Sequence, residues 1–461
     1  MRLLRTQLIA AAYLTVLGCA SVTEPEEIRS TAQAQIPPLP QDFSPTAEAG
    51  VVEVNWIESF NDATLESLVQ EAQSNNRDLQ AAAANVERAW ALAAQAGAAL
   101  TPNVSIAGNA TRSGSVEGSA SSIGALNLGV QVNWEVDLWG RVRSGQQAAI
   151  ASAEAAEADY LFTQYSLAAA IAKGYFISIE AGLQESVARE TVTALEETMR
   201  IVDARYTEGL ASAQDRALTR SDLATARERL IAVEGSRRDA IRALEVLLGR
   251  YPAAELDVRP SLPEVPPPPP AGVPSELLER RPDIIAAERR VAAAFNSVDQ
   301  ARAARLPTVG LTSTIGGTSN ALSSLLDPAN LAWTIGTSLL APIFDGGATQ
   351  AQVDVATAEQ QQALAAFGQA ALGAFSEVES NLDLGGVLTQ QLNLLNEAAQ
   401  EASEAYRIAQ ARYREGETDL LDVLTIQQRV LTADTNRVSV QRSLLEQRVN
   451  LHLALGGSWT E

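Results

Sequence analysis

The stretch LNLGVQVNWEVDL, residues 126–138, alternates between apolar side chains and polar or small ones. Successive side chains of a β-strand point to opposite faces, so a period of two predicts a strand with one apolar face. The alternation lasts 13 residues, whereas soluble strands have about 5–6 residues and tilted membrane strands about 9–11. We therefore predict a membrane strand with Trp134 and Trp139 near the interfaces; a strand of a soluble sandwich is the alternative.

Three further stretches show the same period. Residues 104–111 precede the first stretch, and residues 309–316 and 331–339 form a second pair. Polar sequences, RSGSVEGSASSIG and GTSNALSSLLDPA, separate the members of each pair. The chain is therefore predicted to contain two β-hairpins, over residues 104–138 and 309–343.

Four membrane strands do not form a closed barrel. Bacterial barrels begin at eight strands, and open sheet edges are not tolerated in lipid. A ring of identical chains would close the sheet, with eight strands from two copies or twelve from three. A barrel of eight strands is filled by its own side chains, so a pore favours three or more copies.

The distribution of proline predicts two very long helices. Residues 103–251 and 343–461 contain no proline, and Pro102, Pro252 and Pro342 stand just outside their borders. Proline costs a helix interior about 3 kcal/mol, so its absence permits long helices. Each helix would have about 65 residues and a length of about 100 Å. A soluble coiled coil is one interpretation, and a tube that crosses the periplasm is the other.

The chain repeats itself. Arg-Tyr-x-Glu-Gly occurs at residues 205–209 and again at 412–416, and residues 200–249 match 407–456 at 15 of 50 positions. Upstream, NRDLQAAAANVERA resembles RPDIIAAERRVAAA. We infer a tandem duplication of helix, hairpin, long helix, tip and helix. The predicted parts are a first repeat over 56–251 with its tip at 207–214, a stiff Pro-rich linker over 252–274, and a second repeat over 275–461 with its tip at 414–421.

The N-terminus is typical of a secreted lipoprotein. Arg2 and Arg5 precede an apolar run over residues 8–17, which is too short to span a bilayer and suits a signal peptide. The run ends in Leu-Gly-Cys, which resembles a bacterial lipobox with Cys19 as the acylated first residue. We therefore predict a signal peptide over 1–18 and a lipid-anchored extension over 19–55. Ala20 after the cysteine favours the outer membrane.

Composition excludes most kinds of catalytic or metal site. The chain has one His (His452), one Cys and one Lys (Lys173). Multi-Cys or multi-His zinc sites are therefore excluded, as is a phosphate-binding loop with its Gly-Lys-Ser/Thr. A net charge of −22 argues against nucleic acid as a partner. No enzymatic activity, metal or cofactor is expected.

Several motifs in order resemble the outer membrane factor family, the TolC-like exit ducts. They are TPNVSIAG, WEVDLWGRVR, RRPDIIAAERRVAAAFNSVDQARAARLPTVGL, APIFDGG and the two Arg-Tyr-x-Glu-Gly segments. The lipoprotein branch that serves drug-efflux pumps fits best. The resemblance implies a mainly α protein with transmembrane β-structure. In it, three chains form a twelve-stranded β-barrel, four strands from each, and a long periplasmic α-helical barrel continues it.

The same resemblance implies a function and partners. The homotrimer would sit in outer-membrane lipid and passively conduct small molecules. It would receive them from a periplasmic adaptor protein and an inner-membrane efflux transporter. The alternatives are an exit duct for type I protein secretion and a structural lipoprotein that spans the periplasm without transporting anything.

The resemblance places adaptor binding at the two tips. The candidate residues are Gly209, Leu210, Ala211, Ser212, Gly416, Glu417, Thr418 and Asp419. Each glycine is also suited to end a long helix, so a generic helix-hairpin turn is the alternative.

A gate is expected at the same end. Carboxylates repeated by symmetry form rings that favour cations and repel one another, so other bonds must hold such a gate closed. The candidates are Asp215, Asp419 and Asp422, with Arg205 and Arg412 as candidate bonding partners and Tyr206 and Tyr413 as further gate residues. In the family's constriction Asp422 matches one aspartate position, and Thr425 stands at the next. Helix caps or solvated residues are the alternative for the aspartates, and helix packing is the alternative for the tyrosines. The second tip has three acids and the first has one, so we expect the second to bear more of the gate.

Overall fold

The computed structural model describes residues 23–43, 55–114 and 123–457. They divide into two compact units. The first unit contains residues 84–158 and 283–370 with the described residues before Pro38, and the second contains the rest. Each unit therefore draws on both sequence repeats. The compact units cut across the repeats because the long helices run from one unit into the other.

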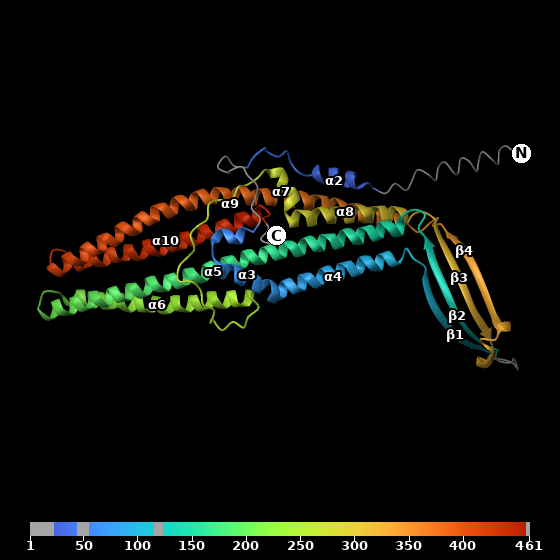
Figure 1. The fold of residues 1–461 in the computed structure, drawn as a ribbon, viewed down its shortest axis with the longest axis horizontal. Coiled ribbons are helices and arrows are strands. Elements are labelled where there is room, and N and C mark those ends of the chain that lie inside the picture. The colour runs from blue at the N-terminus through green and yellow to red at the C-terminus, as the bar shows by residue number, and fades with distance from the viewer. Residues whose placement is uncertain (1–22, 44–54, 115–122, 458–461) are drawn as a thin grey trace. The chain divides into compact units, whose positions relative to one another are not determined.

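The first unit contains a single antiparallel sheet in the order β1-β2-β3-β4 (Figure 1). Its strands are β1 (Asn103–Ser113), β2 (Ile123–Val136), β3 (Thr308–Ser319) and β4 (Leu331–Leu340). They have 11, 14, 12 and 10 residues, so each is long enough for a tilted membrane strand, which needs about 9–11. The two predicted hairpins pair with each other through β2 and β3, where Trp134 lies opposite Leu311.

The strand predicted over 126–138 is shifted in the structure. It begins at Ile123 and ends at Val136, because the carboxylate of the next residue, Asp137, caps the following helix. It accepts hydrogen bonds from the backbone N–H groups of Val142 and Arg143, both at 3.0 Å. Residues 115–122 of the predicted loop lie outside the described residues.

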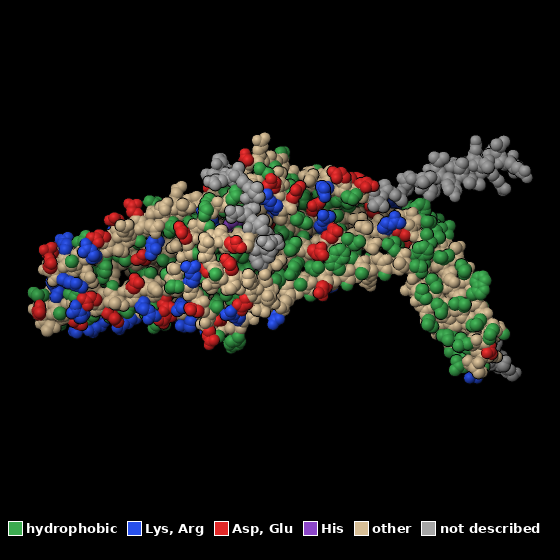
Figure 2. All heavy atoms as spheres, viewed as in Figure 1, with side chains coloured by type: hydrophobic (Ala, Val, Ile, Leu, Met, Phe, Trp, Pro, Cys, Tyr) green, Lys and Arg blue, Asp and Glu red, His purple; other side chains and the backbone are tan. Residues whose placement is uncertain are grey.

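The sheet is apolar and exposed. All of β1 is exposed, including Ile106, and so are Trp333 and Ile335 of β4. Figure 2 shows hydrophobic side chains over the strands and almost no charged ones. The indole N–H of Trp134 donates to the Leu100 carbonyl at 3.0 Å, where the preceding helix ends. Such a surface suits lipid, since a soluble sheet of this size would cover at least one face with other elements.

Helices make up most of the remaining chain. The two long ones have 67 and 68 residues, and each is followed by a helix of 35 residues. They are α5 (Arg141–Thr207), α6 (Ala213–Leu247), α9 (Ala348–Glu415) and α10 (Leu420–Ala454). The shorter ones are α2 (Pro25–Gln33), α3 (Ala63–Asn75), α4 (Arg77–Ala98), α7 (Pro274–Arg280) and α8 (Pro282–Ala303), with short 3₁₀ turns η1 (Trp56–Phe60), η2 (Leu322–Ser324) and η3 (Pro328–Asn330).

One window of α5 is apolar enough to be a candidate membrane span, with a mean hydropathy of 1.2. Half of that window is buried within the structure. A core helix of a large unit shows the same composition. We therefore assign the membrane contact to the exposed strands.

An aromatic core organises the second unit. Trp56, Phe60 and Phe176 are buried together, and the ring centroids of Phe60 and Phe176 lie 5.4 Å apart. The imidazole of His452 stacks on Trp56 at 5.5 Å. Asp62 begins α3 by accepting backbone N–H groups, and it also accepts from Arg259 of the Pro-rich linker at 2.9 Å. The linker is thus held against the same core.

Candidate functional site

Both Arg-Tyr-x-Glu-Gly segments end a long helix in the same way. At the first tip, Gly209 has φ +76°, and the N–H of Leu210 donates to the Arg205 carbonyl at 2.8 Å. At the second tip, Gly416 has φ +83°, and the N–H of Glu417 donates to the Arg412 carbonyl at 2.9 Å. This pattern is a Schellman motif, and it requires a residue that accepts a positive φ. The glycines therefore explain the repeated motif structurally.

The helices that leave the tips begin differently. Ser212 caps α6 through a reciprocal box, because its hydroxyl accepts the N–H of Asp215 and the Asp215 carboxylate accepts the N–H of Ser212. Asp419 precedes α10 without any side-chain capping bond. Beside it, the hydroxyl of Thr418 donates to the Asp422 carboxylate at 2.7 Å. The capping alternative considered for the aspartates therefore applies to Asp215.

Arg205 connects the two tips. Its Nη1 donates to the Tyr413 carbonyl at 2.9 Å, and its guanidinium lies 5.0 Å from the centroid of the Tyr413 ring. Arg412 stays within its own tip, where its Nε lies 3.6 Å from the Glu417 carboxylate. Pairing of these arginines with the tip aspartates was expected. Within the described part of one chain they contact a carbonyl, a ring and a glutamate instead.

The two tyrosines have different environments. Tyr413 is 4% exposed and packs with Val202, Leu420 and Val423, and this burial raises its pKa. Tyr206 is 40% exposed and lies under the guanidinium of Arg216 at 5.1 Å. Helix packing, the alternative considered for both, thus describes Tyr413 far better than Tyr206.

A second contact between the hairpins was not predicted from the sequence. The guanidinium of Arg414 lies 3.3 Å from the Glu197 carboxylate. The hydrogen bond from Arg200 lowers the pKa of Glu197, and Arg414 adds to this effect. Arg414 fills the variable position of the second motif, where the first has Thr207. No local pattern could pair residues 217 positions apart.

Charged side chains and helix ends gather at the tips. Arginines, carboxylates and capped backbone ends meet there. Among the residues that the structure describes, no group of three His, Cys, Asp or Glu side chains is placed to hold a metal ion. The predicted acylation site, Cys19, lies outside the described residues.

Comparison with known proteins gives a consistent picture. The model of the family described as outer membrane efflux protein matches residues 68–250 and 273–457, once for each repeat. The pyoverdine export outer membrane protein OpmQ of Pseudomonas aeruginosa is 32% identical over 415 residues, which are 88% of this chain and 87% of that protein. The probable efflux pump outer membrane protein TtgC of Pseudomonas putida is 31% identical over 459 residues, 96% of this chain and 93% of that one.

Solved channels share the fold. The outer-membrane channel OprN superposes with a TM-score of 0.82 at 30% identity, over 92% of this chain and 99% of that one. The open state of the MtrE outer membrane channel of Neisseria gonorrhoeae gives 0.82 at 28% identity, over 92% and 98%. The expected fold class is confirmed, as are the outer-membrane location and the role of exit duct for efflux. This chain belongs to the outer membrane efflux protein family.

Proposed function

We propose that three copies of the chain form one continuous duct with a gate at the helix tips. The observation that carries this proposal is the four-stranded sheet, whose edge strands β1 and β4 each have one neighbour in the chain. An unpaired edge is not stable in lipid, so neighbouring copies must pair with both edges. Three copies supply twelve strands, enough for an open lumen.

The proposed gate consists of the second tip and the bonds that hold it to the first. Asp419 and Asp422 would form carboxylate rings in the trimer, which repel one another and favour opening. Arg205 opposes opening, because its bond to Tyr413 joins the hairpins within each chain. Asp215 is engaged in its capping box, which supports a structural role for the first tip.

We propose that the tips bind a periplasmic adaptor, which couples the duct to an inner-membrane transporter. Leu210 at the first tip is 64% exposed and offers an apolar contact. The relatives carry names that refer to pyoverdine, toluene and cations. Such varied names support a duct that conducts passively, with cargo selected by the transporter.

We also propose that Cys19 is acylated and anchors the N-terminus. Thr23, four positions later, donates its backbone N–H to the buried Asp299 at 2.8 Å, which would hold the anchored segment against α8. Mass spectrometry of the mature protein should show an acyl mass that Cys19→Ser removes. An unchanged mass in that variant would exclude acylation at this residue.

Planar-bilayer recording tests the duct and its gate together. We expect small conductance steps from the wild type and larger or longer openings from Arg205→Ala, because the bond to Tyr413 is lost. Arg220→Ala on α6 is the matched control, since that arginine is exposed and has no hydrogen bond or ion pair to the described residues of the second hairpin. A complete absence of channels in all three proteins would contradict the duct. Equal openings in the wild type and Arg205→Ala would contradict only the gate.

A further inference from the structure

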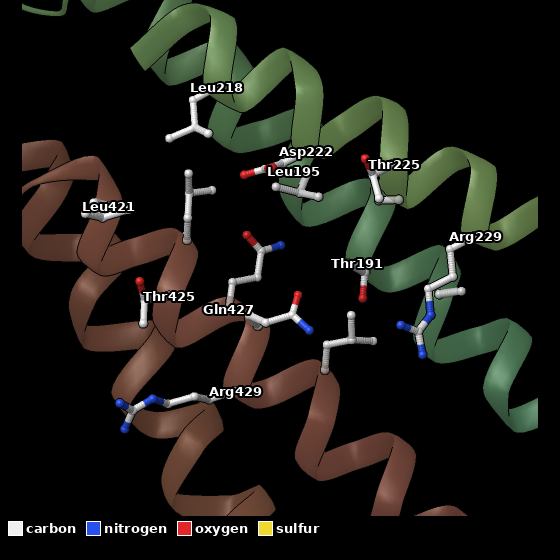
Figure 3. A pocket seen from close by; sticks show the side chains of 15 residues that line it. Thr191, Leu195, Leu218, Asp222, Thr225, Arg229, Leu421, Thr425, Gln427 and Arg429 are labelled. Carbon is white, nitrogen blue, oxygen red and sulfur yellow. The ribbon is translucent and has the colours of Figure 1, made fainter. Parts of the chain in front are cut away.

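A pocket lies in the second unit between the two helical hairpins. Its volume is about 550 Å³, within the range of about 300–1,000 Å³ that small-molecule sites occupy. Helices α5 and α6 form one wall and α10 forms the other (Figure 3). Neither the gate nor the tip turns use it, and the residues that line it are absent from the predicted site.

The walls of the pocket are mostly apolar. Leu195 and Ala226 are buried on the side of α5 and α6, and Leu218 is on the same side. Leu424 and Leu431 come from α10. This surface would hold hydrocarbon rings, because the transfer of apolar surface out of water is favourable.

One polar group in the pocket has no partner. Gln427 is 7% exposed, and neither its amide nitrogen nor its amide oxygen has a hydrogen-bond partner in the described chain. Buried amides are nearly always hydrogen-bonded, since an unmet donor or acceptor is costly. Both atoms are shielded from solvent in this rotamer, so the side chain, which lines the pocket, must rotate to present them to a molecule inside.

One carboxylate and two guanidiniums are among the side chains that line the pocket. Asp222 lies on the α6 wall, and burial raises the pKa of its carboxyl. Arg229, on the same helix, and Arg429, on α10, are exposed. A neutral ligand avoids the cost of bringing an unpaired charge into a mostly apolar site.

We propose that this pocket binds a neutral, mostly apolar small molecule that carries a carboxamide. The ligand amide would accept a hydrogen bond from Nε2 of Gln427 and donate one to its Oε1, and the ligand's rings would fill the leucine-lined space. The occupant would contact both hairpins of one chain, since the walls belong to both repeats. The proposal rests on the pocket alone and does not depend on the gate.

The test compares two probes of the same shape on the full chain in lipid nanodiscs. Benzanilide has two phenyl rings joined by an amide, and bibenzyl has the same rings joined by two methylene groups. Calorimetric titration, with empty nanodiscs as the blank, measures saturable binding. We expect benzanilide to bind at least about tenfold more tightly than bibenzyl, which is about 1.4 kcal/mol.

Two substitutions locate the site. Gln427→Leu should abolish the preference for the amide and leave bibenzyl binding unchanged. Gln73→Leu is the matched control, because the Gln73 amide nitrogen is also buried without a partner but lies outside the pocket lining. Leu421→Trp, at an exposed position of the lining, should weaken both probes by obstructing the pocket without disturbing the core.

The proposal fails if benzanilide shows no saturable binding to the wild type. It also fails if Gln427→Leu binds benzanilide as the wild type does, or if Gln73→Leu loses the preference equally. Circular dichroism of each variant distinguishes loss of a site from loss of the fold. A variant that does not fold leaves the comparison of the two probes on the wild type as the deciding measurement.

Discussion

The two helical hairpins of this chain share a motif, yet they use the same positions differently. Both tips end in a Schellman turn at Gly209 or Gly416. Beyond that turn they diverge, since Arg205 reaches the other hairpin whereas Arg412 stays within its own tip. Duplication has therefore preserved how the backbone ends a helix, and the side chains have acquired separate contacts.

The other ends of the hairpins show the same divergence. Glu245 and His452 occupy equivalent positions of the two repeats and are 3% and 2% exposed. The Glu245 carboxylate accepts backbone N–H groups from Ala254, Glu255 and Leu256. His452 is an uncharged ring stacked on Trp56. One buried position thus holds an anion bound by the N–H groups of the following loop in one repeat and a neutral aromatic ring in the other.

The largest effect on stability is expected from the two tyrosines that occupy equivalent positions in the repeated motif. Tyr413→Ala should lower the free energy of unfolding by about 4 kcal/mol, because it empties a buried aromatic site. Tyr206→Ala should cost less than about 1 kcal/mol, since it removes only an exposed cation–π contact. Urea titrations followed by circular dichroism measure both. Equal losses would show that the tips are equivalent after all.

Glu245→Gln should be the next most destabilising change, at about 3 kcal/mol. Burial by itself raises the pKa of Glu245, but the three N–H groups and Arg250 hold it below its usual value. A neutral amide with one oxygen cannot replace these charge-assisted bonds. Glu228→Gln, on the exposed face of α6, is the control and should change little. A tolerated Glu245→Gln would contradict the role of the carboxylate.

His452 should make the fold sensitive to acid. Burial, with a smaller contribution from Arg448, lowers its pKa to about 4, whereas the unfolded value is about 6.5. Between these two pKa values His452 binds a proton in the unfolded chain but not in the folded chain. The free energy of unfolding therefore falls as the pH drops through this window. When the pH is lowered from about 7.5 to about 5, protonation of this residue in the unfolded chain should lower the free energy of unfolding by about 2 kcal/mol.

His452→Phe keeps a ring against Trp56 and carries no proton. The difference between the unfolding free energies of wild type and variant, taken at both pH values, isolates the histidine from the carboxylates. A difference that does not change with pH would refute this explanation.

The smallest effect concerns the starts of α6 and α10. Ser212→Ala should cost about 1 kcal/mol, because it breaks the capping box with Asp215. Asp419→Ala should cost less than about 0.5 kcal/mol, since that residue makes no capping bond. Thermal melting of the two variants side by side would reveal the difference, and a reversed order would contradict it.

Much of the fold was predictable because its signals are local. Alternation over residues 126–138 predicted a strand, and proline-free stretches predicted the long helices. The end of β2 was misplaced by two residues, because Asp137 continues the alternation while its carboxylate caps α5. Period alone does not distinguish a strand residue from a helix cap.

The candidate site was only partly predictable. Glycine at the tips follows from the positive φ that a Schellman turn needs, so Gly209 and Gly416 could be assigned from the sequence. The partner of Arg205 could not, because Tyr413 is 208 positions away. Gln427 gave no signal either, since an exposed and a buried glutamine look the same in a helical sequence.

The sequence by itself determined the duplication, the kinds of element, the points where helices end and the apolar face of the strands. Each depends on the period or the backbone preference of neighbouring residues. Only the tertiary structure decided which hairpin Arg205 contacts, which tyrosine is buried and where a pocket opens beside Gln427. Those outcomes depend on the packing of helices distant in sequence, which sets burial and hydrogen-bond partners residue by residue.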